Sequence, residues 1–135
     1  MIEEPSDRLI EQRIRNRIYE ILEILAECDG GVDLVGINGY FNLFEDFVHR
    51  PSIESGKSVL SKDEREIVME IAHFLEAACL AMPDFTKVEF IASGWPEQIA
   101  PKARDARTLF LIRGLFSEEF EEAEPGQSIA ARAAR

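Results

Sequence analysis

The chain has 135 residues, of which 46% are apolar and 30% charged, a composition typical of one globular domain and unlike that of disordered, collagen-like or disulfide-rich chains. Its net charge of −11 opposes binding to nucleic acid phosphates and to anionic lipids, and favours basic or neutral partners. No apolar run approaches the roughly 20 residues of a membrane span, and the acidic N-terminus lacks the pattern of a secretory signal, so we expect a cytoplasmic protein.

A long amphipathic helix is predicted over residues 7–28, with Ser6 as its N-cap and Gly30 or Gly31 as its stop. Arginines crowd its first half and glutamates its second half, which is the reverse of what the helix macrodipole favours. We expect burial of the apolar stripe to outweigh that cost. The predicted inward residues are Ile10, Ile14, Ile18, Ile21, Leu22 and Leu25. The arginines at the edges of this stripe are predicted to cover the core and pair with acidic neighbours, or else to form a binding rim; they are Arg8, Arg13, Arg15 and Arg17.

A second helix is predicted to begin at Asn38, after a non-helical connection over residues 29–37. Asn38-Gly39 is by itself a hairpin signal, but the apolar residues that follow, as far as Val48, form one broad helical stripe and do not alternate. Residues 51–58 are rich in Pro, Ser and Gly and predict a loop.

The third helix is predicted most clearly. Ser61 and Glu64 form a capping-box pattern, acidic residues fill the first turns, and an apolar stripe runs from there to Pro83. This helix is therefore predicted to contribute a face of the core.

The last part of the chain predicts a short helix, a longer helix and a tail. Residues 85–92 fit either a strand or a short helix, and helix is favoured because no neighbouring strand is predicted to pair with them. The longer helix is predicted to carry Pro101 in its first turn, Ile112 on its inner face and Gly114 as its stop. An acidic run and an Ala/Arg-rich end follow, and fraying is predicted beyond Pro125.

Two carboxylate–histidine pairs suggest a metal site as an alternative. A carboxylate and a histidine three residues apart on each of two helices supply ligands in di-iron bundles. On helical wheels both histidines face away from the apolar stripes, which favours an ordinary solvated surface. The residues are Asp46, His49, Glu70 and His73. No nucleophile lies at a matching local spacing from either histidine, so no catalytic site is predicted.

Candidate binding residues lie elsewhere in the chain. Trp95, the sole tryptophan, is predicted either to close the end of the core or to serve as an exposed anchor for a partner. The acidic run either pairs with the basic residues of the preceding helix or is free to bind a basic partner. The candidate binding residues are Trp95, Arg13, Arg17, Glu118, Glu119, Glu121 and Glu122.

Together these features predict an all-α single domain, an irregular bundle of four to five helices over residues 1–116, followed by a partly disordered tail over residues 117–135. The preferred hypothesis is a non-catalytic protein-interaction module, of an inhibitor or immunity type, whose acidic surface binds a basic protein without nucleic acid, membrane or cofactor. The wide apolar arcs of the first two helices leave a homodimer open. The alternative is a metal-binding or metal-dependent helical bundle.

Overall fold

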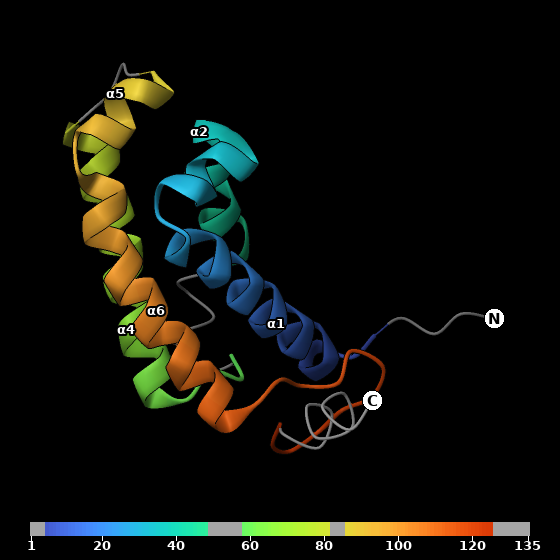
Figure 1. The fold of residues 1–135 in the computed structure, drawn as a ribbon. Helices are drawn as coiled ribbons and strands as arrows, with labels where there is room; N and C mark the ends of the chain where they lie inside the picture. The colour runs from blue at the N-terminus through green and yellow to red at the C-terminus, as the bar shows by residue number, and fades with distance from the viewer. Residues whose placement is uncertain (1–4, 49–57, 82–85, 126–135) are drawn as a thin grey trace.

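The computed structural model describes residues 5–48, 58–81 and 86–125, and in these ranges the chain forms five α-helices and no strand. They are α1 (Asp7–Ala26), α2 (Asp29–Phe47), α4 (Lys62–Ala81), α5 (Lys87–Ala92) and α6 (Trp95–Arg113). The predicted all-α bundle is confirmed. Helices α4 and α6 lie side by side, α1 packs mainly against α6, and α2 turns back from the end of α1 (Figure 1). No helix in the described ranges combines the length and apolar character needed to cross a lipid bilayer.

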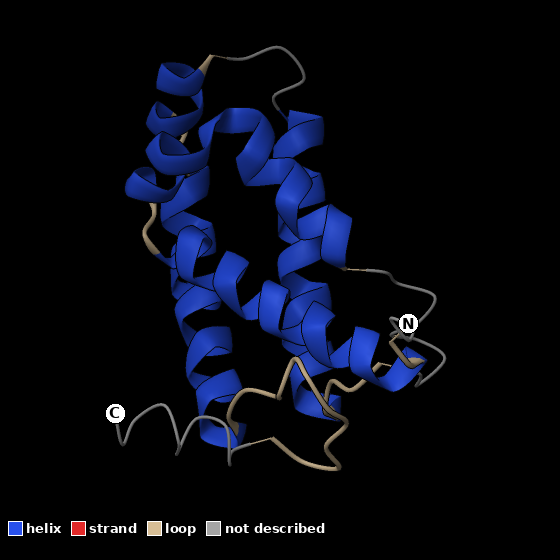
Figure 2. Ribbon diagram, turned by 90° about the vertical axis from the view of Figure 1, so that its right-hand side faces the viewer, coloured by secondary structure: helices blue, strands red, loops and turns tan. Residues whose placement is uncertain are grey.

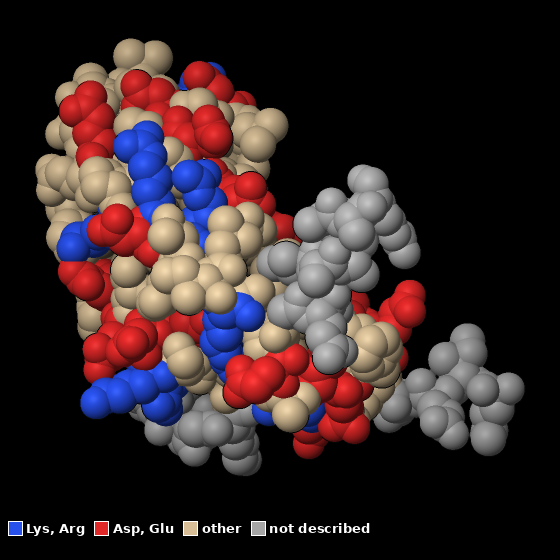
Figure 3. Space-filling view, turned by 60° about the horizontal axis from the view of Figure 1, so that its bottom comes forward, with Lys and Arg blue, Asp and Glu red and all other residues tan. Residues whose placement is uncertain are grey.

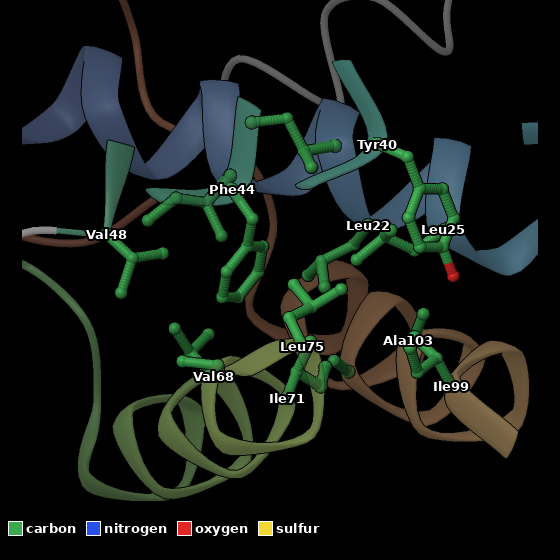
Figure 4. Packing of buried hydrophobic residues seen from close by; sticks show 14 of the residues in the cluster. Leu22, Leu25, Tyr40, Phe44, Val48, Val68, Ile71, Leu75, Ile99 and Ala103 are labelled. Atoms are coloured by element: carbon green, nitrogen blue, oxygen red, sulfur yellow. The ribbon is translucent and has the colours of Figure 1, made fainter. Parts of the chain in front are cut away.

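Helices and loops make up the described ranges (Figure 2), and one apolar core joins the four longer helices (Figure 4). The short helix α5 packs against this core through Phe90. Residues that meet there include Leu22, Leu25, Phe44, Ile71, Leu75, Ile99 and Ala103. The rings of Tyr40, Phe41 and Phe90, with centroids 5.0–5.6 Å apart, attach α5 to α2. Because burial of such side chains is the main stabilising contribution to folding, this core accounts for the arrangement of the helices.

Helix α1 follows the prediction at its start and for most of its apolar stripe. The Ser6 hydroxyl caps it by accepting a hydrogen bond from the Leu9 amide at 3.1 Å. Ile10, however, is 40% exposed, so its predicted inward position is wrong. Near its N-terminus the helix instead buries a polar side that carries Gln12 and Asn16, because a later part of the chain covers that side.

The predicted connection over residues 29–37 is wrong, because α2 begins directly at Asp29. A Cβ atom at Gly31 would lie 2.0 Å from the carbonyl oxygen of Ile24, so only glycine lets α2 start this close to the last turn of α1. The helix is interrupted at Gly36, whose φ of 76° and ψ of 170° are not helical. A second helical stretch therefore begins after Gly36 and runs to Phe47, close to the predicted helix start at Asn38.

Helices α4 and α5 agree with the sequence patterns. The capping box of α4 is present, with Ser61 N–H to Glu64 Oε1 at 3.0 Å and Glu64 N–H to Ser61 Oγ at 3.2 Å. Within the range 85–92, which fits either a strand or a short helix, Lys87–Ala92 form helix α5. This helix has its own capping box between Thr86 and Glu89. The preference for helix over strand is confirmed.

Helix α6 begins earlier than predicted. Gly94 takes a left-handed conformation (φ 87°, ψ 0°), Trp95 starts the helix, and Pro101 lies inside it and not in its first turn. The predicted stop at Gly114 is confirmed. Ile112 is 78% exposed, so its predicted inward position is wrong; it lies on the outer side of α6.

The backbone between α1 and α2 leads to a stability prediction. Cys28 has φ 57° and ψ −120°, a combination that side chains disfavour. Cys28→Gly should raise the free energy of unfolding by about 0.5–2 kcal/mol, because relief of strain exceeds the extra entropy that glycine gives the unfolded chain. Urea denaturation would measure the change.

Gly36→Ala is the matched control for that experiment. A Cβ at Gly36 has open space around it, so alanine there adds backbone strain without a clash. The control should lower the free energy of unfolding by about 1–3 kcal/mol. A loss of stability in Cys28→Gly would contradict the strained geometry of Cys28.

Candidate interaction site

A buried ion pair joins three helices. The Arg15 side chain of α1 is 1% exposed, and its guanidinium binds both carboxylate oxygens of Glu64 in α4, at 3.1 and 2.7 Å. The same guanidinium donates to the carbonyl oxygens of Phe110 and Gly114 at the end of α6, at 3.3 and 2.6 Å. A cation is favoured at a helix C-terminus and a carboxylate at a helix N-terminus, so this pair links the end of α6 to the start of α4. Arg15 is thus a buried bridge and not the edge residue that the sequence predicted.

Glu64 has further partners that keep it ionised. Nη1 of Arg113 donates to its carboxylate at 2.8 Å, and the Ser61 amide donates to the same oxygen. Burial alone raises the pKa of the Glu64 carboxyl, but hydrogen bonds with Arg15 and the positive charges of Arg15 and Arg113 outweigh burial and hold that pKa below its ordinary value. The site therefore contains a buried, ionised carboxylate whose oxygens accept hydrogen bonds from Arg15, Arg113 and the Ser61 amide.

Beyond α6, residues 114–125 form what we call the C-terminal segment, which runs along α1 towards the N-terminal end of that helix (Figure 1). Its anchor is the fully buried ring of Phe116. The guanidinium carbons of Arg8, Arg15 and Arg113 each lie 5.4 Å from the centroid of this ring. Such distances are those of cation–π contacts, so the anchor occupies a pocket walled by arginine.

Two amide side chains of α1 bind the backbone of the C-terminal segment. Asn16 accepts from the Phe116 amide at 3.2 Å and donates to the Phe116 carbonyl at 2.9 Å. Gln12 donates to the carbonyls of Ser117 and Phe120, each at 2.9 Å, and accepts from a backbone amide further along at 2.8 Å. Since these contacts involve the main chain, they depend on the path of the segment, which bends at residues 118–120 and is also held by the Ser117 hydroxyl, an acceptor from the amides of Glu119 and Phe120.

Three arginines of α1 complete this attachment. Arg13 donates through Nε to the carbonyl oxygen of Glu118 at 2.9 Å, and Arg17 pairs with the Glu118 carboxylate. Arg8 donates to two carbonyl oxygens near the end of the segment, at 2.7 and 3.0 Å. We call the five attaching side chains the α1 clamp; they are Arg8, Gln12, Arg13, Asn16 and Arg17. Two of the candidate binding residues, Arg13 and Arg17, therefore bind a third, Glu118.

The outer side of the C-terminal segment is the side that the α1 clamp does not bind. Glu119 and Glu121 are exposed, and the Phe120 side chain between them is 59% exposed. Glu122 points back instead, and its carboxylate accepts from the Ser117 amide. An open hollow of about 410 Å³ adjoins this outer side and is lined by Pro5, Ser6, Leu9, Arg13, Glu119, Phe120 and Glu121. Acidic side chains with basic ones between them cover this end of the molecule (Figure 3).

Trp95 and the candidate metal ligands lie apart from the C-terminal segment. Trp95 opens α6 at the opposite end of the bundle, where it is partly buried against the core. Among the candidate ligands, Glu70 pairs with Lys102, while Nδ1 of His73 lies 3.7 Å from a carboxylate oxygen of Glu76 on its own helix. Asp46 is exposed on α2, and His49 lies outside the described residues. Across the described ranges no three side chains of the His, Cys, Asp and Glu types converge on one point.

Sequence patterns did not place several residues in this site. Gln12, Asn16 and Glu64 are buried polar residues, and hydropathy patterns give no sign of where such residues point. The one available signal was the spacing of Arg8, Gln12 and Asn16, which recur every four residues and so share one side of a helix.

No family model, no curated protein and no solved structure matches this chain.

The ion pair of Arg15 predicts a large stability effect. Arg15→Met should lower the free energy of unfolding by about 3–5 kcal/mol, because it leaves Glu64 charged and buried with fewer partners. Lys87→Met removes an exposed pair with Asp33 and should cost less than about 1 kcal/mol. Equal losses in the two variants, measured by chemical denaturation, would show that burial of the Arg15 pair has no special effect.

Glu64 also predicts the pH dependence of stability. Its pKa is lower in the folded protein than in the unfolded chain, so the unfolded chain binds the proton more tightly. The stabilisation is therefore complete above the ordinary glutamate value of about 4.3 and is lost as the pH falls below it. The stability difference between the wild type and Glu64→Gln should shrink over that acidic range. A difference that stays constant from neutral pH to about pH 3 would contradict this assignment.

Proposed function

We propose that this chain is a cytoplasmic, non-catalytic protein-interaction module whose acidic surface binds a basic face of a partner protein, as an inhibitor or immunity-type binder does. One observation carries the proposal: eight of the eleven Lys and Arg side chains in the described ranges make hydrogen bonds or ion pairs within the chain, while carboxylates such as Glu119 and Glu121 stand on the outer surface. A protein with a net charge of −11 and its cations used in this way presents a negative field to a partner.

Three cationic side chains outside α1 illustrate these contacts within the chain. Lys87 pairs with Asp33 at 2.9 Å. Arg104 donates to a carbonyl oxygen at the end of α1 at 3.1 Å. Arg113 binds Glu64, and its Nε also lies 3.2 Å from a carboxylate oxygen of Glu124. Lys87 and Arg113 thereby offset two exposed carboxylates, and the remaining negative charge of the surface is what a basic partner would meet.

The outer side of the C-terminal segment is the part of the surface best suited to a basic partner. Glu119 and Glu121 supply charge for lysine or arginine, and Phe120 offers its ring to their aliphatic stems or cationic ends. The α1 clamp fixes the backbone that carries these three side chains. A surface held in this way loses less conformational entropy when it binds.

Selection from a library of short random peptides tests the proposal. Peptides enriched on the immobilised protein should be rich in Lys and Arg, and their binding should weaken as sodium chloride is raised. The double variant Glu119→Gln/Glu121→Gln should bind the enriched peptides about fivefold more weakly, since each exposed ion pair contributes only modestly.

A matched control is Glu45→Gln/Asp46→Asn, which removes the same charge from an exposed part of α2. This control should retain most of the binding. Enriched peptides without an excess of basic residues, or equal losses in the two double variants, would overturn the proposal.

A further inference from the structure

The inner side of the C-terminal segment points to a second interaction surface. Five arginines line the face of the molecule that the segment covers: Arg8, Arg13, Arg15, Arg17 and Arg113. Within this face Glu64 is the buried carboxylate that offsets them. An acidic protein thus concentrates positive charge in one groove, and an acidic piece of its own chain lies in that groove.

The contacts in the groove resemble recognition of a peptide more than packing of a core. Those beyond the Phe116 anchor are chiefly polar, and most are made by side chains of α1 to backbone carbonyl and amide groups. The segment has no helix or strand of its own between Gly114 and Pro125. Three of its side chains are bound individually: the Phe116 ring by three guanidinium groups, the Glu118 carboxylate by Asn16 and Arg17, and the exposed Glu124 carboxylate by Arg113.

We propose that the groove formed by the α1 clamp and the arginine-walled pocket of Phe116 is a receptor for an acidic peptide with the pattern Phe-x-Glu, and that the C-terminal segment occupies it in the same molecule as a competitor. The partner is a protein whose acidic segment carries this pattern. The proposal does not rest on the basic partner proposed above, and the two partners exclude one another, because displacing the segment also removes its outer side from the α1 clamp.

The segment attached to the same chain is at a high effective concentration, so a free peptide binds only in the fraction of molecules whose groove is open. Weakening the attached segment without altering the groove should therefore increase the affinity for a free peptide. Phe116→Ala removes the aromatic anchor, and Glu118→Lys reverses the charge that Arg17 binds. Both substitutions change the segment and leave the side chains of α1 unaltered.

A synthetic peptide of residues 114–125, carrying a fluorophore, is the probe. Its anisotropy would be measured with the full-length wild type, with Phe116→Ala and with Glu118→Lys. Both variants should bind the peptide at least about tenfold more tightly than the wild type does. Glu118→Lys is included because Glu118 is partly exposed, so it tests the same competition if loss of the buried ring unfolds Phe116→Ala.

Controls distinguish the groove from general charge attraction. Phe120→Ser alters an exposed ring of the same segment and should bind the peptide as the wild type does. A peptide with alanine in place of both Phe116 and Glu118 should not bind any variant. Adding Asn16→Leu to Glu118→Lys should abolish the gain, since Asn16 binds both the backbone and the carboxylate of the segment.

Three outcomes would overturn the proposal. If Glu118→Lys, folded as judged by its melting curve, binds the peptide no more tightly than the wild type, the segment is a fixed part of the fold. If a scrambled peptide of equal charge binds equally well, the groove attracts charge without recognising the pattern. If the variants form dimers that exclude the peptide, the occupant is a second copy of this chain and not a separate partner.

Discussion

The bidentate contact between Arg15 and Glu64 fixes how α1 and α4 are aligned within a bundle that the apolar core stabilises. A guanidinium and a carboxylate that are both buried lose most of their hydration, and they are tolerated only when their geometry and further hydrogen bonds compensate. Here the compensation comes from the start of α4 and the end of α6, whose partial charges suit the carboxylate and the guanidinium respectively. The pair therefore defines how α1, α4 and α6 align along their lengths.

That alignment also decides where the chain goes after α6. Arg15 holds the Gly114 carbonyl and lies against the Phe116 ring, so the C-terminal segment leaves α6 directly onto α1. The segment then has two different sides. Its inner side is bound by the arginines and amides of α1, and its outer side presents Glu119, Phe120 and Glu121. The outer side of the C-terminal segment therefore presents part of the excess negative charge of the chain on one defined surface.

Local patterns in the sequence predicted the helices well where one apolar stripe faced one core. The α4 capping box, the choice of helix for α5 and the stop at Gly114 all depend on neighbouring residues, and all are confirmed. The errors arise where packing overrides those patterns. Helix α2 starts early because Gly31 permits close contact with α1, and Ile10 is exposed because Gln12 and Asn16 take the buried side.

The amino-acid sequence by itself determined the all-α class, most helix ends and the acidic balance, because hydrophobic periodicity, caps and charge are local or additive properties. Only the tertiary structure decided which polar residues are buried and which acidic residues face outward. Arg15, Glu64 and Phe116 lie up to about a hundred positions apart in the chain. These residues meet because the helices pack against one another. Contacts between residues so far apart in the chain produce no periodic pattern in the neighbouring sequence.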